Sequence, residues 1–173
     1  LLWRDSSVDG LKTGHTNAAG YCLVSSAKRR DMRLISVVMG TDSEKARARE
    51  TQKLLSYGFR HYDTKTIYST GDIIKENAKV WYGEDEFLNL TIAENVTLTL
   101  PRGAQKNLSA NILVDEQIKA PITAGQELGR LQVSLNDEIL IDTALVAEKD
   151  VAESGLFSRF VDWVLLFITQ LMS

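Results

Sequence analysis

Residues 8–21 read VDGLKTGHTNAAGY, which is a short apolar lead-in, a Lys-Thr-Gly triplet and a polar turn punctuated by glycine. An apolar run, residues 21–24, follows at once, so the stretch predicts a β-hairpin whose first strand carries the triplet. Gly14 lacks the Cβ that would hold a ligand's main chain away from that strand. Lys12 adds a positive charge and Thr13 adds a hydroxyl donor. The triplet therefore suits a strand edge that docks a carboxylate.

The next residues extend this hairpin. Two apolar runs, 21–26 and 33–39, flank a basic loop and predict an antiparallel three-stranded meander. Thr41 and Glu44 have the spacing of a capping box, and the apolar residues after them recur at helical spacing. We expect this helix to end near residue 57, with Gly58 as a left-handed cap. Three strands and one helix are too little for an independent fold, so we expect them to close a larger sheet.

Charge is spread unevenly along the 173 residues. Residues 1–60 hold 11 basic and 6 acidic side chains, a net of +5, whereas residues 61–173 hold 9 and 17, a net of −8. Such a step indicates a domain boundary near residue 61. The basic half suits an anionic ligand, but it lacks interleaved aromatic side chains, so we expect no nucleic-acid partner.

Residues 64–150 have a different character. Short alternating runs, such as 96–100 and 131–135, are separated by turn residues, and this spacing predicts a small all-β sandwich. Asn136-Asp137 lies between two runs and predicts a tight hairpin turn. No Cys, His or paired carboxylates cluster at ligand spacing, so we expect neither a metal nor a cofactor.

Residues 155–173 predict an amphipathic helix. Its polar side chains, among them Arg159 and Asp162, fall within an arc of roughly 120° that Leu166 interrupts, and apolar side chains cover the rest. The uncharged apolar stretch is shorter than the roughly 20 residues that a spanning helix needs. We therefore expect a helix that lies in the membrane interface. The side chains expected to anchor it are Phe157, Phe160, Trp163 and Phe167.

Several stretches together resemble the low-molecular-mass penicillin-binding proteins, the serine D-alanyl-D-alanine carboxypeptidases of the bacterial periplasm. They are LLW (1–3), VDGLKTGHT (8–16), AGY (19–21), MRLISVVMG (32–40), KLLSYGFR (53–60), LPRG (100–103), API (120–122) and GQ (125–126). They occur in the same order as in that family, and the resemblance covers nearly the whole chain.

The resemblance implies an α+β fragment followed by an all-β sandwich and a C-terminal amphipathic helix. Residues 1–63 would be the C-terminal part of a catalytic domain of the serine β-lactamase/transpeptidase type, contributing its closing strands and helix. Residues 64–150 would be the small β-sandwich domain, and residues 151–173 the helix that anchors the protein to the membrane.

The resemblance also implies an activity. The terminal D-alanine of peptidoglycan pentapeptides would be removed through a serine acyl-enzyme, and penicillin would acylate the same serine. Lys12 would supply positive potential to the cleft, and the backbone N–H of His15 would be one oxyanion donor. Thr13 and Arg47 would hold the substrate's carboxylate, with Gly14 leaving room for its backbone.

Two motifs of that family, the nucleophile motif and Ser-x-Asn, normally lie upstream of Lys-Thr-Gly. We therefore expect the N-terminal part of the catalytic domain to be a missing partner, and we predict that the isolated chain hydrolyses nothing. Ser25-Ser26-Ala27-Lys28 and Ser109-Ala110-Asn111 fit the two patterns. The first lies at a strand end and the second in the β domain, so neither is expected to be catalytic.

The expected location is the periplasm, peripheral on the inner membrane, and the expected partners are D-Ala-D-Ala peptides, β-lactams and the membrane surface. The alternative is a non-enzymatic, membrane-associated β-sandwich module for binding or scaffolding, with a vestigial active-site strand. A class A β-lactamase is a third reading, but it would leave the β domain and the C-terminal helix unexplained.

Overall fold

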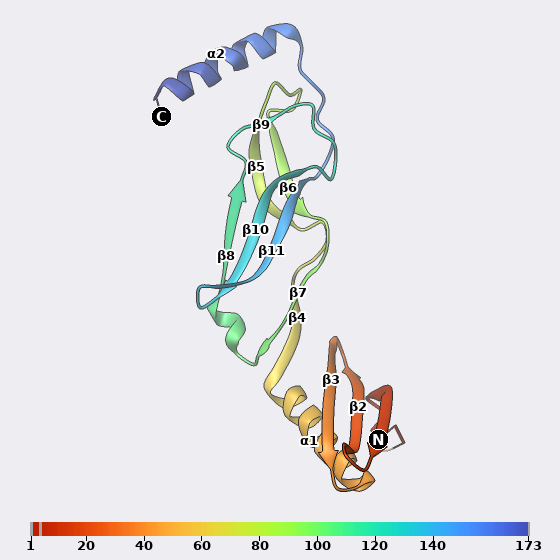
Figure 1. The fold of residues 1–173 in the computed structure, drawn as a ribbon. Helices are drawn as coiled ribbons and strands as arrows, with labels where there is room; N and C mark the ends of the chain where they lie inside the picture. The colour runs from red at the N-terminus through yellow and green to blue at the C-terminus, as the bar shows by residue number, and fades with distance from the viewer. Residues whose placement is uncertain (1, 4, 173) are drawn as a thin grey trace. The chain divides into compact units, whose positions relative to one another are not determined.

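The computed structural model describes residues 2–3 and 5–172, and the side chains of Phe157 and of residues 168–172 lie outside that description. The described chain is mostly β-sheet with two α-helices (Figure 1), which confirms the coarse fold prediction. Its elements are β1 (Val8–Thr16), β2 (Gly20–Arg29), β3 (Met32–Thr41), α1 (Glu44–His61), β4 (Tyr62–Tyr68), β5 (Ile73–Trp81), β6 (Phe87–Ile92), β7 (Val96–Pro101), η1 (Ala104–Asn107), β8 (Leu108–Val114), β9 (Ile118–Lys119), β10 (Glu127–Leu135), β11 (Glu138–Ala147) and α2 (Leu156–Met172).

The chain divides into two compact units. Unit 1 comprises Leu1–Lys65 and Leu98–Gln105, and unit 2 comprises Thr66–Thr97 and Lys106–Ser173. β4 and β7 pair with each other as a two-stranded sheet, and each contributes residues to both units. The chain therefore passes between the units three times, twice within these strands and once after Gln105.

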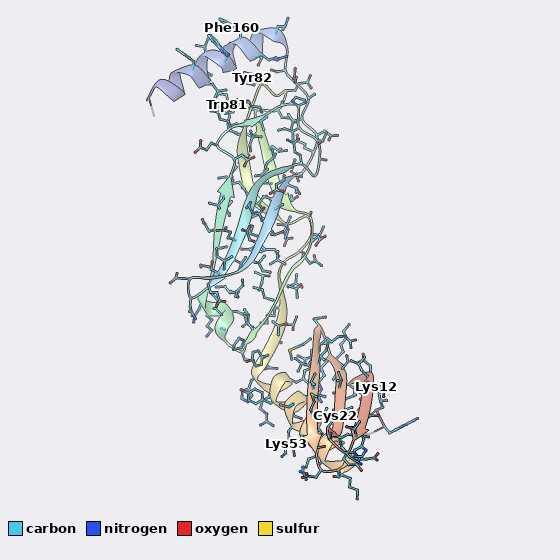
Figure 2. All side chains as sticks on the ribbon, viewed as in Figure 1. Lys12, Cys22, Lys53, Trp81, Tyr82 and Phe160 are labelled. Atoms are coloured by element: carbon cyan, nitrogen blue, oxygen red, sulfur yellow. The ribbon has the colours of Figure 1, made fainter. Side chains whose placement is uncertain are left out.

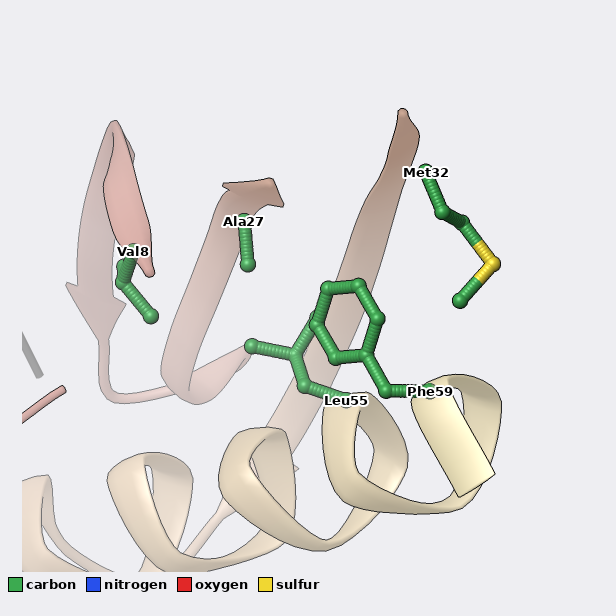
Figure 3. Packing of buried hydrophobic residues seen from close by; sticks show 5 residues of the cluster. All are labelled: Val8, Ala27, Met32, Leu55 and Phe59. Atoms are coloured by element: carbon green, nitrogen blue, oxygen red, sulfur yellow. The ribbon is translucent and has the colours of Figure 1, made fainter. Parts of the chain in front are cut away.

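Unit 1 is an antiparallel sheet in the order β1-β2-β3, so the predicted meander is confirmed. α1 covers one face because Thr51, Leu55 and Phe59, spaced four residues apart, form its buried stripe. Figure 3 shows Leu55 and Phe59 pointing from the helix toward Val8, Ala27 and Met32 of the sheet. Burial of these side chains from both elements holds the helix against the strands.

On its opposite face, β3 carries exposed apolar side chains. Ile35, Val37 and Met39 alternate along β3 with the residues that face α1, and they are 66%, 55% and 71% exposed. Within the described part of the chain, no element covers them. A patch of this kind is typical of a surface that packs against another segment or partner.

The limits of α1 differ from the prediction at both ends. The N-cap is Ser43, whose hydroxyl accepts a hydrogen bond from the Ala46 N–H at 3.1 Å. Thr41 instead donates its hydroxyl to the Tyr21 carbonyl at 2.9 Å, so the Thr41–Glu44 capping box is wrong. Gly58 is not a left-handed cap, because the helix continues to His61. A Cβ at Gly58 would lie 2.5 Å from Leu34 Cδ1, so glycine here lets the helix approach β3 closely.

Unit 2 is built on a six-stranded sheet in the order β8-β10-β11-β6-β5-β9, in which only the β5–β9 pair is parallel. Asn136 and Asp137 have φ values of 49° and 68°, so the predicted tight turn between β10 and β11 is confirmed. The most deeply buried apolar residues of this unit are Val80, Leu88, Leu90, Ile92, Ile118, Leu131, Val133, Leu145 and Val151.

α2 occupies the tail, where a helix was predicted. Among the described residues, neither α1 nor α2 has the length and hydropathy needed to cross a membrane.

Gly129 on β10 permits close contact with the neighbouring strand. A Cβ at this position would overlap the Leu113 carbonyl oxygen and lie 3.1 Å from Val114 Cα, both backbone atoms of β8. We expect Gly129→Ala to lower the free energy of unfolding by about 1–3 kcal/mol, because backbone cannot yield as a side-chain end can. Urea unfolding measures this, with Gly155→Ala as the control, since a Cβ at Gly155 meets nothing within 4 Å. Equal midpoints for the two variants would contradict the prediction.

Asp9 and Arg33 tie β1 to β3 across β2. Arg33 Nη1 lies 2.9 Å from Asp9 Oδ1 and 2.8 Å from Oδ2, and the hydrogen bond from Arg33, followed by one from Ser26, lowers the pKa of Asp9.

Because the pKa of Asp9 is lowered by folding, this link contributes stability above the ordinary carboxyl pKa and loses it as the pH falls through the folded value. We expect Arg33→Met to raise the pKa of Asp9 toward its ordinary range, as followed by an NMR titration of the Asp9 carboxyl carbon. Arg49→Met is the control, since Arg49 pairs with Glu50. An Asp9 titration that Arg33→Met leaves unchanged would rule out Arg33 as the cause.

Candidate active-site strand

β1 is the edge strand of the three-stranded sheet and carries Lys12, Thr13, Gly14 and His15 in succession. It pairs with β2 on one side, with Gly14 opposite Cys22, while its other side has no strand among the described residues. A Cβ built on Gly14 would meet nothing within 4 Å, so the space beside this residue is open. Figure 2 shows Lys12 on this outer strand.

α1 brings Arg47 to the triplet. Its Nη1 donates a hydrogen bond to the Gly14 carbonyl at 3.2 Å, and its Nη2 lies 3.4 Å from Glu44 Oε1. The side chain is only 13% exposed, so contacts hold the guanidinium in place. Arg47 and Gly14 are far apart in sequence, and the packing of α1 on the sheet is what joins them.

Tyr21 contacts both His15 on β1 and Arg47 on α1. Its ring centroid is 4.0 Å from that of His15, its cross-strand partner, and 5.6 Å from Arg47 Cζ. Cation–π attraction at this distance helps to orient the guanidinium.

Sequence reasoning gave no role in the site to Tyr21 or to Glu44. The signals that could have found them are the pairing of Tyr21 with His15 across the predicted hairpin and the i,i+3 spacing of Glu44 and Arg47.

Lys12, Thr13 and Arg47 line one open hollow of about 630 Å³ between β1 and the start of α1. Lys12 Nζ donates to the Thr13 carbonyl. The hollow's charged lining is Lys12, Lys45 and Arg47 against Glu44 alone, a net positive potential. The structure therefore brings together three of the predicted site residues in a hollow suited to an anion, with His15 next along the strand.

The two sequences that mimic the missing motifs lie in strands. Ser25 and Ser26 are buried in β2, and Ser25 lies three residues from Lys28, which places the two side chains on opposite faces. Ser109 and Asn111 lie on β8. The helix start that a nucleophilic Ser-x-x-Lys motif requires is present at neither place.

Of the residues predicted to anchor the tail, Phe160, Trp163 and Phe167 are exposed on α2, and the side chain of Phe157 lies outside the described part. In that described part, no group of three or more His, Cys, Asp or Glu side chains could hold a metal ion.

Comparison with protein families assigns both parts of the chain. Residues 62–153, more than half of the chain, match the model described as penicillin-binding protein 5, C-terminal domain. Residues 1–43, which include β1 to β3, match the model of D-alanyl-D-alanine carboxypeptidase.

Curated relatives and solved structures agree with this. The chain is 40% identical over 172 residues to D-alanyl-D-alanine carboxypeptidase DacC of Escherichia coli (strain K12), covering 98% of this chain and 43% of that protein. It is 38% identical over 176 residues to DacA of Haemophilus influenzae, covering 100% of this chain and 44% of DacA. The structure of penicillin binding protein 5 from Haemophilus influenzae aligns with a TM-score of 0.74 at 37% identity, over 88% of this chain and 45% of that one.

The chain spans less than half the length of these relatives. The Lys-Thr-Gly strand, the arginine that contacts it and the two family matches lead to one assignment. The chain belongs to the D-alanyl-D-alanine carboxypeptidase family of penicillin-binding protein 5.

Proposed function

We propose that this chain is the C-terminal part of a serine D-alanyl-D-alanine carboxypeptidase that trims peptidoglycan pentapeptides and binds penicillin. The observation that carries the proposal is the hydrogen bond from Arg47 to the Gly14 carbonyl. It holds a fixed cation beside the open edge that presents Lys12 and Thr13. A peptide's terminal carboxylate is the ligand that this combination fits, because a guanidinium pairs with a carboxylate through parallel N–H donors.

Each residue of the edge has a role in this reading. Arg47 has five N–H donors, of which one is used by Gly14 and one by Glu44, so donors remain for a substrate carboxylate. The Thr13 hydroxyl supplies a further donor. The substrate backbone lies along the free edge of β1 as an added strand, and Gly14 leaves room for it.

The chemistry follows from the same placement. Lys12 supplies positive potential at the start of the edge, and the backbone N–H of His15 stabilises the oxyanion that forms as a serine attacks the peptide carbonyl. Loss of one such donor raises an acyl-transfer barrier by about 2.7–4 kcal/mol. The attacking serine belongs to an upstream part of the catalytic domain, so the 173-residue chain alone is inactive in this proposal.

The remaining parts complete the proposal. Residues 1–63 are the closing strands and helix of the catalytic domain, and residues 64–150 are a β-sandwich domain, a division supported by the family match at 62–153. Residues 151–173 hold the protein on the periplasmic surface of the inner membrane, supported by exposed aromatic side chains on α2. Their partner is the lipid surface.

Labelling with a fluorescent penicillin tests the activity. We expect the full-length protein to carry the label covalently on a serine upstream of this segment, and the 173-residue chain to carry none, because the acyl-enzyme needs that serine. Mass spectrometry of the labelled peptide identifies the site. A full-length protein without label would favour the non-enzymatic scaffold module instead.

Arg47→Ala in the full-length protein tests the carboxylate site. Loss of a charge-assisted hydrogen bond of about 1.5–3 kcal/mol is expected to lower kcat/KM for a D-Ala-D-Ala peptide about ten- to a hundredfold. Arg49→Ala is the matched control, since Arg49 lies on the same helix and pairs with Glu50. The wild type is expected to prefer a free C-terminus over a C-terminal amide, and Arg47→Ala to lose this preference. An unchanged preference would remove Arg47 from the site.

A further inference from the structure

α2 contacts the rest of unit 2 through its polar side. Asp162 Oδ2 accepts a hydrogen bond from the Tyr82 backbone N–H at 2.8 Å, and Arg159 Nη1 lies 2.6 Å from Glu153 Oε2. Leu166, one turn beyond Asp162 on the same side, is only 7% exposed. Leu166 is the apolar residue that interrupts the polar arc predicted from the sequence. The structure explains this exception, because Leu166 is buried on the side of α2 that packs against the protein.

The segment that leads into α2 is fixed at the same place. The Glu84 N–H donates to the Ala152 carbonyl at 2.9 Å, and the Ser154 N–H donates to the Tyr82 carbonyl at 2.8 Å. These bonds and the Asp162 contact all involve the turn that follows β5. The start of α2 and the turn at residues 82–86 therefore form one local structure.

This docking leaves an aromatic stripe on the outside. Phe160, Trp163 and Phe167 fall within about 60° of one another around the helix. Neighbouring ring centroids are 6.2 and 5.9 Å apart, and the three side chains are 62%, 56% and 55% exposed. An ordinary surface helix turns its large apolar side chains inward, whereas this one turns a polar side inward. Figure 2 labels Phe160 on the helix and Tyr82 on the docking turn.

The charge around the stripe is not basic. The docking turn carries Glu84, Asp85 and Glu86, and Glu153 precedes the helix. The cations that meet this acidic group are each in an ion pair, Lys79 with Glu86, Lys149 with Asp85 and Arg159 with Glu153. The last turn of α2 holds no basic residue. This part of the described chain therefore offers no excess positive charge to an anionic lipid headgroup.

We propose that α2 binds a neutral, zwitterionic lipid surface by immersing the Phe160–Trp163–Phe167 stripe, without help from anionic lipids. The inference rests on the membrane association proposed above and specifies its chemistry. Aromatic side chains are favoured at the headgroup boundary, where flat apolar rings leave water while the polar face of the helix stays outside. Asp162 is a positioning residue, because its bond to the Tyr82 N–H keeps the polar side of α2 turned toward the protein.

Vesicle partitioning of the full-length protein tests the proposal. The probes are vesicles of phosphatidylcholine alone and vesicles in which phosphatidylglycerol replaces a third of it, each at low and high salt. We expect partition coefficients that agree within about twofold across all four conditions, since charge contributes little. We expect Trp163→Ser to lower them by about tenfold, because a large apolar side chain no longer leaves water. Ile139→Ser is the control, since Ile139 is 52% exposed but lies on β11.

The following outcomes distinguish a failure of the inferred lipid preference from a failure of the proposed membrane anchoring. Binding that requires phosphatidylglycerol and is lost in salt would overturn the inference while membrane association stands. Binding that is unchanged after deletion of residues 155–173 would overturn membrane anchoring by α2 altogether. Self-association in the absence of lipid that Trp163→Ser abolishes would assign the stripe to a second copy of the chain instead.

The positioning role of Asp162 has its own measurement. We expect faster hydrogen exchange at the Tyr82 amide in Asp162→Ala, and near wild-type exchange in Asp162→Asn, since the amide oxygen still accepts the bond. Equal exchange in Asp162→Ala and the wild type would contradict the role.

Discussion

The packing of α1 against one face of the β1-β2-β3 sheet is the constraint on which the candidate site depends. Leu55 and Phe59 bury themselves against the strands, and this fixes the helix in register with β1. Arg47, two turns before Leu55, then reaches the Gly14 carbonyl. A hydrophobic contact on one part of the helix thus sets the position of a cation on another, and neither strand nor helix would form the hollow alone.

The two units expose different features. In unit 1, charged links such as Asp9–Arg33 cross the sheet and hold its edge strand while the other face of β3 stays apolar and exposed. In unit 2, the turn after β5 receives both the chain that enters α2 and the Asp162 carboxylate. Each unit therefore uses a few polar contacts to place one exposed feature, a strand edge in the first and an aromatic stripe in the second.

Local sequence patterns correctly predicted the elements whose conformation depends mainly on residues near them in the chain. The Asn136-Asp137 turn and the three-stranded meander follow from turn chemistry and apolar runs. The two ends of α1 could not be predicted in this way, because they depend on contacts with the sheet. Gly58 packs closely against Leu34 on β3, and the Thr41 hydroxyl donates to the Tyr21 carbonyl on β2. In the candidate site the triplet was found from its residue types. Tyr21 and Glu44 were missed as members of the site because their roles require the register of β1 with β2 and the docked helix.

The edge of β1 that is unpaired within the described chain carries a risk of aggregation as well as a proposed role in binding. A strand edge without a paired neighbour, as proposed here for binding a short peptide, can equally accept a strand from another molecule, which begins aggregation. Glycine weakens strand propensity, and a lysine charge beside it disfavours stacking of identical chains. In the proposed site, Lys12 and Gly14 thus leave this edge accessible to a substrate peptide and disfavour its pairing with an identical chain.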